Sequence, residues 1–167
     1  MEVTLMELLD SREQRVWHQQ ELLEKYGGTL VSVTLNIPGP IKDKPQYRKV
    51  MEWGIEALLG AFGSNVMYKE TRFLKTGAEG YVCIDGLEPE EAKYIAVLVE
   101  SMAPKARLLD IDVMGKDGAV SRRELGLEPR KCLLCDEDAK ACARSQKHSM
   151  EELLAKVKEL CYDEANI

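Results

Sequence analysis

The sequence predicts an α+β domain with a split βαββαβ core of the ferredoxin-like or palm-like kind. A helix flanks this core at each end, and a Cys-rich loop precedes the last helix. Two observations predict it: hydrophobic periodicity gives the order strand, helix, strand, strand, helix, strand, and the length of 167 residues suits one domain. We expect a single domain over 1–167, with its core at about 29–120, a Cys/His-rich loop at 129–148 and a C-terminal helix at 149–163.

Helix and strand patterns alternate in the first half of the chain. Residues 11–14, Ser-Arg-Glu-Gln, read as a capping box that opens a helix ending at the glycine pair 27–28. Residues 31–37 alternate apolar and polar side chains, which predicts a half-buried strand. The Pro-Gly-Pro turn at 38–40 stops this strand, and residues 46–62 repeat apolar side chains at helical spacing.

The second half completes the core. Residues 66–74 predict a strand, 76–80 a glycine-containing break, and 81–84 a short apolar strand. Pro89 suits the first turn of a helix running to about residue 102, and residues 107–113 predict the last strand. We expect both core helices on one face of the sheet. A second capping box, Ser-Met-Glu-Glu, opens the C-terminal helix.

Composition and charge restrict the classes of function that fit this chain. The net charge of 23 − 29 = −6 and the aromatic content of 6% argue against a general nucleic-acid binder. Residues 122–148 nevertheless carry seven Lys and Arg against five Asp and Glu, a local balance of +2 that suits a compact anionic ligand or an acidic partner. No apolar run approaches the roughly 20 residues of a membrane span. Five cysteines without a secretory signal indicate a reducing cytoplasm.

The sharpest chemical feature is the segment Leu-Asp-Ile-Asp-Val at 109–113. Side chains alternate across a strand, so Asp110 and Asp112 share one face. Two such carboxylates repel each other unless a cation lies between them, and Mg²⁺ would bridge them to substrate phosphates. The alternative is a solvated strand face, which aspartate's poor strand propensity disfavours without excluding it.

The Cys-rich loop has the spacing of a metal site. Cys132 and Cys135 are separated by two residues, and Cys142 and His148 follow. Three thiolates and one imidazole could close a tetrahedral zinc site of the structural type. Free thiols packed against the domain are the alternative. The remaining cysteines, at 83 and 161, are expected to be inert core residues.

Basic residues cluster around turns and beside the Asp strand. Arg12 and Arg15 are expected in the first turn of the first helix, where the macrodipole disfavours cations unless an anion binds there. Lys42 follows the Pro-Gly-Pro turn. Each is either an ordinary solvated charge or part of a phosphate site. The remaining candidates follow the Asp strand along the chain: Arg122, Arg123, Arg130 and Lys131.

Several stretches together resemble one family. They are Ser-Arg-Glu-Gln-Arg at 11–15, Asn-Ile-Pro-Gly-Pro-Ile-Lys at 36–42, Thr-Gly-Ala-Glu-Gly at 76–80, Leu-Asp-Ile-Asp-Val at 109–113, Ser-Arg at 121–122, and Pro-Arg-Lys-Cys-Leu-Leu-Cys at 129–135, followed by Cys-Ala-Arg-Ser at 142–145 and His148. In this order the chain resembles the citrate lyase holo-acyl-carrier-protein synthases, also called apo-citrate lyase phosphoribosyl-dephospho-CoA transferases.

The resemblance implies a defined reaction. Such enzymes are nucleotidyltransferases that move phosphoribosyl-dephospho-CoA from 2′-(5″-triphosphoribosyl)-3′-dephospho-CoA to a serine of the acyl carrier (gamma) subunit of citrate lyase, and pyrophosphate leaves. On this reading Asp110 and Asp112 hold Mg²⁺ and are catalytic. Phosphate binding falls to Arg12, Arg15, Lys42 and Arg107, and carrier docking to Arg122, Arg123, Arg130 and Lys131.

One departure from the family pattern is visible, and one other class of function stays open. Where the family has Pro-Leu-Gly-Arg, this chain has Pro-Lys-Ala-Arg at 104–107, so Ala106 replaces a glycine that would let the backbone approach the donor. The alternative function is a non-enzymatic, zinc-knuckle-like module that binds RNA or protein. A third reading keeps the enzyme but gives it the carrier of a related acyl-lyase complex.

Overall fold

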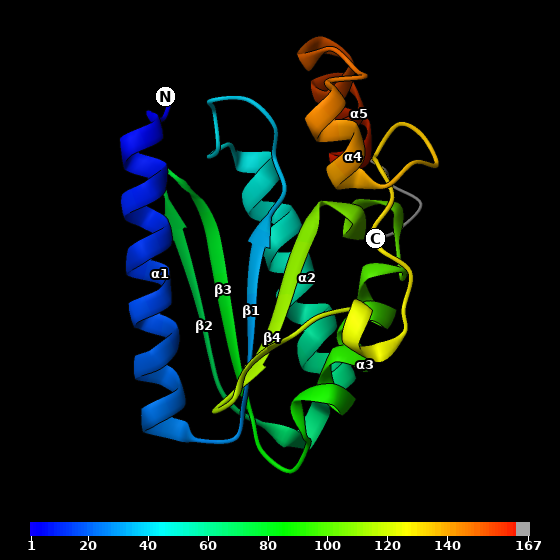
Figure 1. Cartoon of the computed structure of the whole chain (residues 1–167). Coiled ribbons are helices and arrows are strands. Elements are labelled where there is room, and N and C mark those ends of the chain that lie inside the picture. Colours follow the sequence, from blue (N-terminus) through cyan, green and yellow to red (C-terminus); the bar gives the residue numbers. More distant parts are fainter. Residues whose placement is uncertain (163–167) are drawn as a thin grey trace.

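A computed structural model describes residues 1–162 of the chain (Figure 1). Within them it has five α-helices and one five-stranded antiparallel sheet, an α+β fold as predicted. The strands are β1 (Thr29–Leu35), β2 (Val66–Leu74), β3 (Gly77–Ile84), β4 (Leu109–Gly115) and β5 (Gly118–Val120). The helices are α1 (Leu5–Tyr26), α2 (Pro45–Phe62), α3 (Pro89–Glu100), α4 (Ala139–Ser145) and α5 (Met150–Cys161). None of these helices is long and apolar enough to cross a membrane.

The strand order β2-β3-β1-β4-β5 places β1 at the centre of the sheet. The main core lies between one face of the sheet and helices α2, α3 and α5; its sheet residues include Val31, Val33 and Val82. Helix α1 covers part of the opposite face, where Leu22 packs against Leu30, Tyr81 and Cys83 (Figure 1). Helices α2 and α3 therefore share one face, as expected. On the other face α1 lies over β1, β3 and β2, where His18 contacts Glu70 of β2.

The first helix begins earlier than predicted. Its cap is Thr4, whose hydroxyl accepts from the backbone of Glu7 while the Glu7 carboxylate accepts from the backbone of Thr4. The expected capping box at Ser11 is therefore wrong, because the same Thr/Ser-x-x-Glu/Gln pattern occurs seven residues earlier, at Thr4, and good helix formers follow it. Arg12 and Arg15 consequently lie in the middle of α1 and not in its first turn.

Two strands also differ from expectation. Strand β1 is buried on both faces and not half-buried, because α1 covers its polar side and Gln19 donates to the hydroxyl of the buried Ser32 at 2.9 Å. Strand β3 extends back to Gly77, through the segment read as a break. Gly80 lies inside this strand, and glycine is needed there because a Cβ would lie 2.5 Å from Ile55 Cδ1 on α2.

The Cys-rich segment carries more secondary structure than the predicted loop. Lys131 and Asp138 form an isolated β-bridge, and the Asp138 carboxylate caps the short helix α4. Helix α5 opens with the predicted capping box of Ser149 and Glu152 and ends at Cys161. The predicted end of this helix at residue 163 lies outside the described residues.

The turn between α1 and β1 offers a stability test with a built-in control. Gly27 and Gly28 both have positive φ, +66° and +62°, but a Cβ on Gly28 would lie 2.4 Å from the Ile84 carbonyl oxygen, whereas nothing lies within 4 Å of one on Gly27. We expect Gly27→Ala to cost about 1–3 kcal/mol through backbone strain. Gly28→Ala should cost about 1–3 kcal/mol more because the backbone must move. Urea unfolding measures both; equal losses would contradict the predicted clash.

Candidate functional site

The two aspartates of β4 lie together on the accessible face of the sheet. Asp110 and Asp112 are exposed, while Leu109, Ile111 and Val113 between and beside them are buried in the core. On the neighbouring strand β1, Thr34 is opposite Asp110 and Ser32 is opposite Asp112. Alternation along β4 therefore brings both carboxylates to one face, as the sequence predicts.

The carboxylates affect each other. Asp112 reaches solvent but is surrounded by the walls of a cleft, and this enclosure, followed by the negative charge of Asp110, raises the pKa of Asp112 above the ordinary aspartate value. Lys93 and Arg15 oppose the shift with their positive charges without cancelling it. A pair of oxygen ligands that carries uncompensated negative charge fits a hard divalent cation such as Mg²⁺.

The open edge of β4 is covered by basic side chains. Strand β5 pairs with β4 only from Val113 onward, so the carbonyls before that point that face away from β1 have no partner strand. Arg130 donates to the carbonyl oxygens of Leu109 and Arg107, both at 2.7 Å, and Lys93 donates to that of Ile111 at 2.7 Å. Two fixed positive groups, Arg130 and Lys93, thus border the strand that carries the aspartates.

A cleft of about 650 Å³ opens over this edge. It brings the Asp pair together with residues from β5, the following 3₁₀ turn and the Cys-rich segment. Glu100, 6% exposed, sits at its wall and forms ion pairs with Arg122 and, at 3.7 Å, with Arg130. The polar and charged residues of the lining are Asn36, Lys93, Glu100, Asp110, Asp112, Ser121, Arg122, Arg123, Arg130, Asp138 and Lys140.

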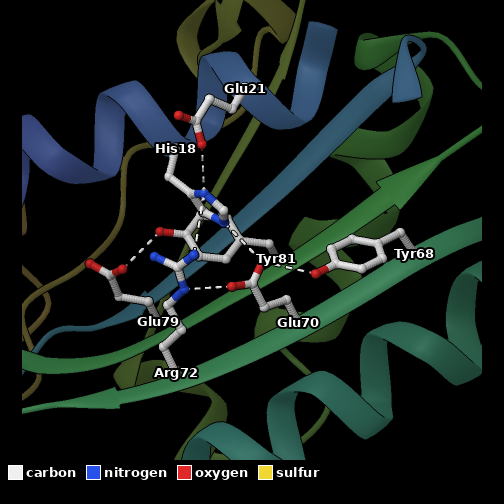
Figure 2. Close-up of polar contacts among 7 residues, drawn as sticks. All are labelled: His18, Glu21, Tyr68, Glu70, Arg72, Glu79 and Tyr81. Atoms are coloured by element: carbon white, nitrogen blue, oxygen red, sulfur yellow. Dashed lines mark hydrogen bonds and ion pairs between the residues drawn. The ribbon is translucent and has the colours of Figure 1, made fainter. Parts of the chain in front are cut away.

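A polar network joins α1 to the sheet next to this site (Figure 2). The carboxylate of Glu79, 4% exposed, accepts from Arg15 Nε at 2.9 Å and from the Tyr81 hydroxyl at 2.8 Å. His18 lies between Glu70, at 2.8 Å, and Arg72, at 3.3 Å. These contacts fix the rotation of α1 and hold the Arg15 guanidinium where its charge acts on Asp112.

Within this network the carboxylate of Glu70 is held in its charged form. Burial alone would raise its pKa, but hydrogen bonds from His18 and Arg72 together bring the pKa of Glu70 below the ordinary value. Burial also raises the pKa of Tyr81, so this phenol stays neutral and donates to Glu79. The network therefore serves as a rigid support with defined proton positions.

Arg12 and Lys42 come together from separate elements. Partial burial and, after it, the positive charge of Arg12 lower the pKa of Lys42. The Lys42 ammonium donates to the Ile37 carbonyl within the same turn. Ser11 contacts Thr76 of the β2–β3 turn at 3.0 Å, and the backbone N–H of Asn36 donates to the Leu108 carbonyl at 2.7 Å. Lys42 therefore lies near Gly77 of the β2–β3 turn, within range of the charge of Arg12 on α1.

Three of the predicted arginines beyond α1, Arg107, Arg122 and Arg130, have partners within the protein. Arg107 donates to the carbonyl oxygens of Cys132, at 2.6 Å, and Leu133, at 3.4 Å, and thereby holds the Cys-rich segment. Arg122 pairs with Glu100 and donates to the Glu128 carbonyl at 3.1 Å. Arg107, Arg122 and Arg130 also line a second cavity of about 820 Å³ beside the first. Ala106, in contrast, is buried in the core and lines neither cavity.

The three predicted cysteines and His148 converge at one point. Their ligand atoms all lie within 4.8 Å of one another; Cys135 Sγ is 3.4 Å from both Cys142 Sγ and His148 Nε2. Tetrahedral zinc with Zn–S bonds near 2.3 Å separates its sulfur ligands by about 3.7 Å, so the cluster has metal-binding dimensions. Cys83 and Cys161 lie elsewhere, and burial raises the pKa of each to about 11, so both remain thiols.

Three residues of the site were not identified from the sequence: Lys93, Glu79 and Glu100. Glu79 falls in the segment read as a turn, and Glu100 near the end of an amphipathic helix. For Lys93 a signal exists, because it stands directly beside Ala92, on the side of α3 that packs in the core. A charged residue at the border of an apolar helix face can equally be exposed to solvent. Only the position of the β4 edge shows that Lys93 is buried.

Comparisons with known proteins agree on one family. Residues 3–164 match the family described as apo-citrate lyase phosphoribosyl-dephospho-CoA transferase. A protein of Vibrio cholerae serotype O1 bearing that name is 38% identical over 167 residues, covering 98% of this chain and 94% of the relative. One of Streptococcus pyogenes is 35% identical over 165 residues, covering 96% and 86%.

Proposed function

The chain belongs to the family of apo-citrate lyase phosphoribosyl-dephospho-CoA transferases, and from this membership we propose how its cleft performs the transfer. The protein is a transferase that attaches the phosphoribosyl-dephospho-CoA prosthetic group to apo-citrate lyase. The observation that supports the proposed chemistry is the Asp110–Asp112 pair at the floor of a cleft bordered by fixed cations.

The proposed donor is 2′-(5″-triphosphoribosyl)-3′-dephospho-CoA, and the acceptor is a serine of the acyl carrier (gamma) subunit. The serine oxygen forms a bond to the α-phosphorus of the donor. The bond from that phosphorus to its bridging oxygen breaks, and pyrophosphate leaves with the bridging oxygen. The serine proton passes to a cleft carboxylate or to solvent. Because the acceptor supplies the nucleophile, this chain mainly positions the reactants and stabilises charge.

Asp110 and Asp112 are the residues that would hold Mg²⁺. Their shared face, their mutual repulsion and their oxygen ligands fit this ion. When bound, Mg²⁺ supplies positive charge against the triphosphate and the departing pyrophosphate. Asp112 must lose its proton for this role, and the nearby charges of Lys93 and Arg15 favour that loss.

Basic residues of the chain neutralise the remaining phosphate charge. Glu79 holds Arg15 through Nε, which directs the rest of the guanidinium fork to a ligand. Arg12 of α1 and Lys42, near the β2–β3 turn, are the proposed contacts for more distant phosphates. The proposed carrier-docking residues are Arg122, Arg123, Arg130 and Lys131, of which Arg122 and Arg130 also hold Glu100. Arg107 acts at a distance, through the Cys-rich segment that it holds.

The proposed fold type is the ferredoxin-like, palm-like arrangement. Its support is the strand order β2-β3-β1-β4 with α2 and α3 on one face, which leaves the opposite face of β4 free for a ligand. The proposed ion in the Cys-rich segment is Zn²⁺ in a structural role, since Cys132, Cys135, Cys142 and His148 leave no open position.

A direct test is the intact mass of the carrier subunit after incubation with this chain, the donor and Mg²⁺. We expect a mass gain equal to the donor minus pyrophosphate, on one serine. Omission of the donor is the control. No gain with a carrier and donor that a related transferase accepts would contradict the proposed function. A gain on the carrier of another acyl-lyase, but not on that of citrate lyase, would correct the identity of the acceptor.

A further inference from the structure

Lys93 is a buried ammonium group whose place in the fold is unusual. It lies on α3, directly beside Ala92 of the hydrophobic core, and its exposed fraction is 6%. Lysine side chains are almost never this buried unless they are paired. The burial of Lys93 therefore indicates that its ammonium group has a specific partner.

The ammonium group approaches the open edge of β4. Lys93 Nζ donates to the carbonyl oxygen of Ile111 at 2.7 Å, and Ile111 is the residue between the two aspartates. The carbonyl oxygens of Arg107 and Leu109, further along the same edge, accept hydrogen bonds from Arg130. Lys93 thus contacts the backbone of β4 next to the proposed reaction centre and lines the same cleft as Asp110 and Asp112.

The contacts of Lys93 within the described residues include no ion pair, and the charge of Asp112 in the same cleft acts on it only from beyond ion-pair distance. An ammonium group has three donors, and the Ile111 carbonyl uses one. Among residues 1–162 no carboxylate forms an ion pair with Lys93, whereas Arg122 and Arg130, which line the same cleft, both pair with Glu100. A buried charge without an opposite partner is costly, and a polyanionic ligand would relieve that cost.

We propose that Lys93 is a phosphate-binding residue that donates to a non-bridging oxygen of the donor's triphosphate and stays bound to the pyrophosphate as it leaves. This inference rests on the proposed function and deepens it. Lysine serves as a point charge toward phosphate, and its charge here adds to that of the cation proposed on the Asp pair. Because pyrophosphate carries the developing charge, Lys93 stabilises the transition state as well as the bound donor.

The test uses Mg²⁺-pyrophosphate as a product inhibitor of the full-length protein. Lys93→Gln keeps an N–H donor for the Ile111 carbonyl but removes the charge. We expect its inhibition constant for pyrophosphate to rise about 10- to 100-fold, the effect of losing one charged hydrogen bond. Inhibition by 3′-dephospho-CoA, which lacks the triphosphate, should not change. Lys116→Gln, at the exposed β4–β5 turn, is the matched control and should leave both constants unchanged.

Lys93→Arg separates a charge role from a packing role. If the charge matters, the Arg variant keeps more pyrophosphate affinity than the Gln variant; if Lys93 only fills space, the larger Arg is the worse substitution. Should the Gln variant fail to fold, Lys93→Met is compared with Arg in its place. The inference is overturned if charge removal weakens both inhibitors equally, or neither. In those cases transfer to the carrier by the wild-type protein still supports the proposed function.

Discussion

Replacing Asp112 by asparagine is expected to abolish transfer while leaving the metal-free protein slightly more stable. The variant keeps its shape but loses one of two carboxylate ligands, which removes several kcal/mol of charge stabilisation from the transition state, about 10²- to 10⁴-fold in rate. The stability gain follows because ionised Asp112 is disfavoured in the folded protein by its enclosure and by Asp110. Solvent screening limits this gain to about 1 kcal/mol or less.

The measurement combines turnover with thermal unfolding. Without Mg²⁺ the Asp112→Asn protein should melt at or slightly above the wild-type temperature. With Mg²⁺ the wild-type protein should gain stability by ligand binding, and the variant should not. Asp117→Asn makes the same charge change at the exposed β4–β5 turn and serves as the control for both measurements. Full activity of Asp112→Asn would show that this carboxylate is not a ligand.

The pH dependence has a definite sign. The pKa of Asp112 is raised in the folded protein, so the folded state holds its proton more tightly than the unfolded state. The contribution of Asp112 to stability is therefore most favourable below its unfolded pKa of about 4 and declines as pH rises through its folded pKa. Mg²⁺ binding has the opposite pH dependence, because it requires the ionised form of Asp112. Activity should thus fall on the acid side at a pH above the ordinary aspartate range.

The sequence predicts this aspartate pair well because only local geometry is needed. Alternation along a strand is a property of every strand, so Asp110 and Asp112 had to share a face once β4 was identified. The helix at 45–62 was likewise placed to within one residue, because its periodicity is strong. The strand at 66–74 has the predicted bounds although its alternation is impure. The Cys132, Cys135, Cys142 and His148 cluster was predicted from spacing, which chelation constrains.

Tertiary structure decides what the sequence left unpredicted. Ser32 looked like the polar side of a half-exposed strand, and only the position of α1 above it makes it buried. The environment of Lys93 depends on how far the pairing of β5 extends along β4, and no local sequence pattern encodes that position. Arg107 and Arg122 were assigned to the substrate by charge, but their guanidinium groups contact backbone carbonyls and Glu100 of the same chain. Charge counting cannot distinguish an arginine that awaits a ligand from one that has a protein partner.

The second large effect is expected from Cys135→Ser. Cys135 Sγ contacts both Cys142 Sγ and His148 Nε2, so its loss opens the cluster at its centre. Residues 129–148 contribute few residues to the main core, and a metal that binds only the folded state supplies order to such a segment. The segment also supplies Asp138, Ala139 and Lys140 to the wall of the Asp cleft. Its displacement should reduce transfer on the order of 10²-fold through misplacement of the reactants.

Three measurements follow from this expectation. The purified wild-type protein should contain zinc, which elemental analysis would detect and which the Cys135→Ser protein should lack. The helices α1 to α3 do not depend on the cluster, so circular dichroism should stay close to that of the wild type. Limited proteolysis should cut the variant at Lys131 and Lys140 first, because their segment has lost its anchor. Cys161→Ser is the control, because Cys161 lies outside the cluster and burial raises the pKa of its thiol to about 11, so that the thiol stays protonated. Absence of zinc from the wild-type protein and from both variants, with equal protease resistance, would show that the four ligand atoms meet without a metal. The cleft wall would then owe its position to contacts such as those of Arg107 and the β-bridge between Lys131 and Asp138.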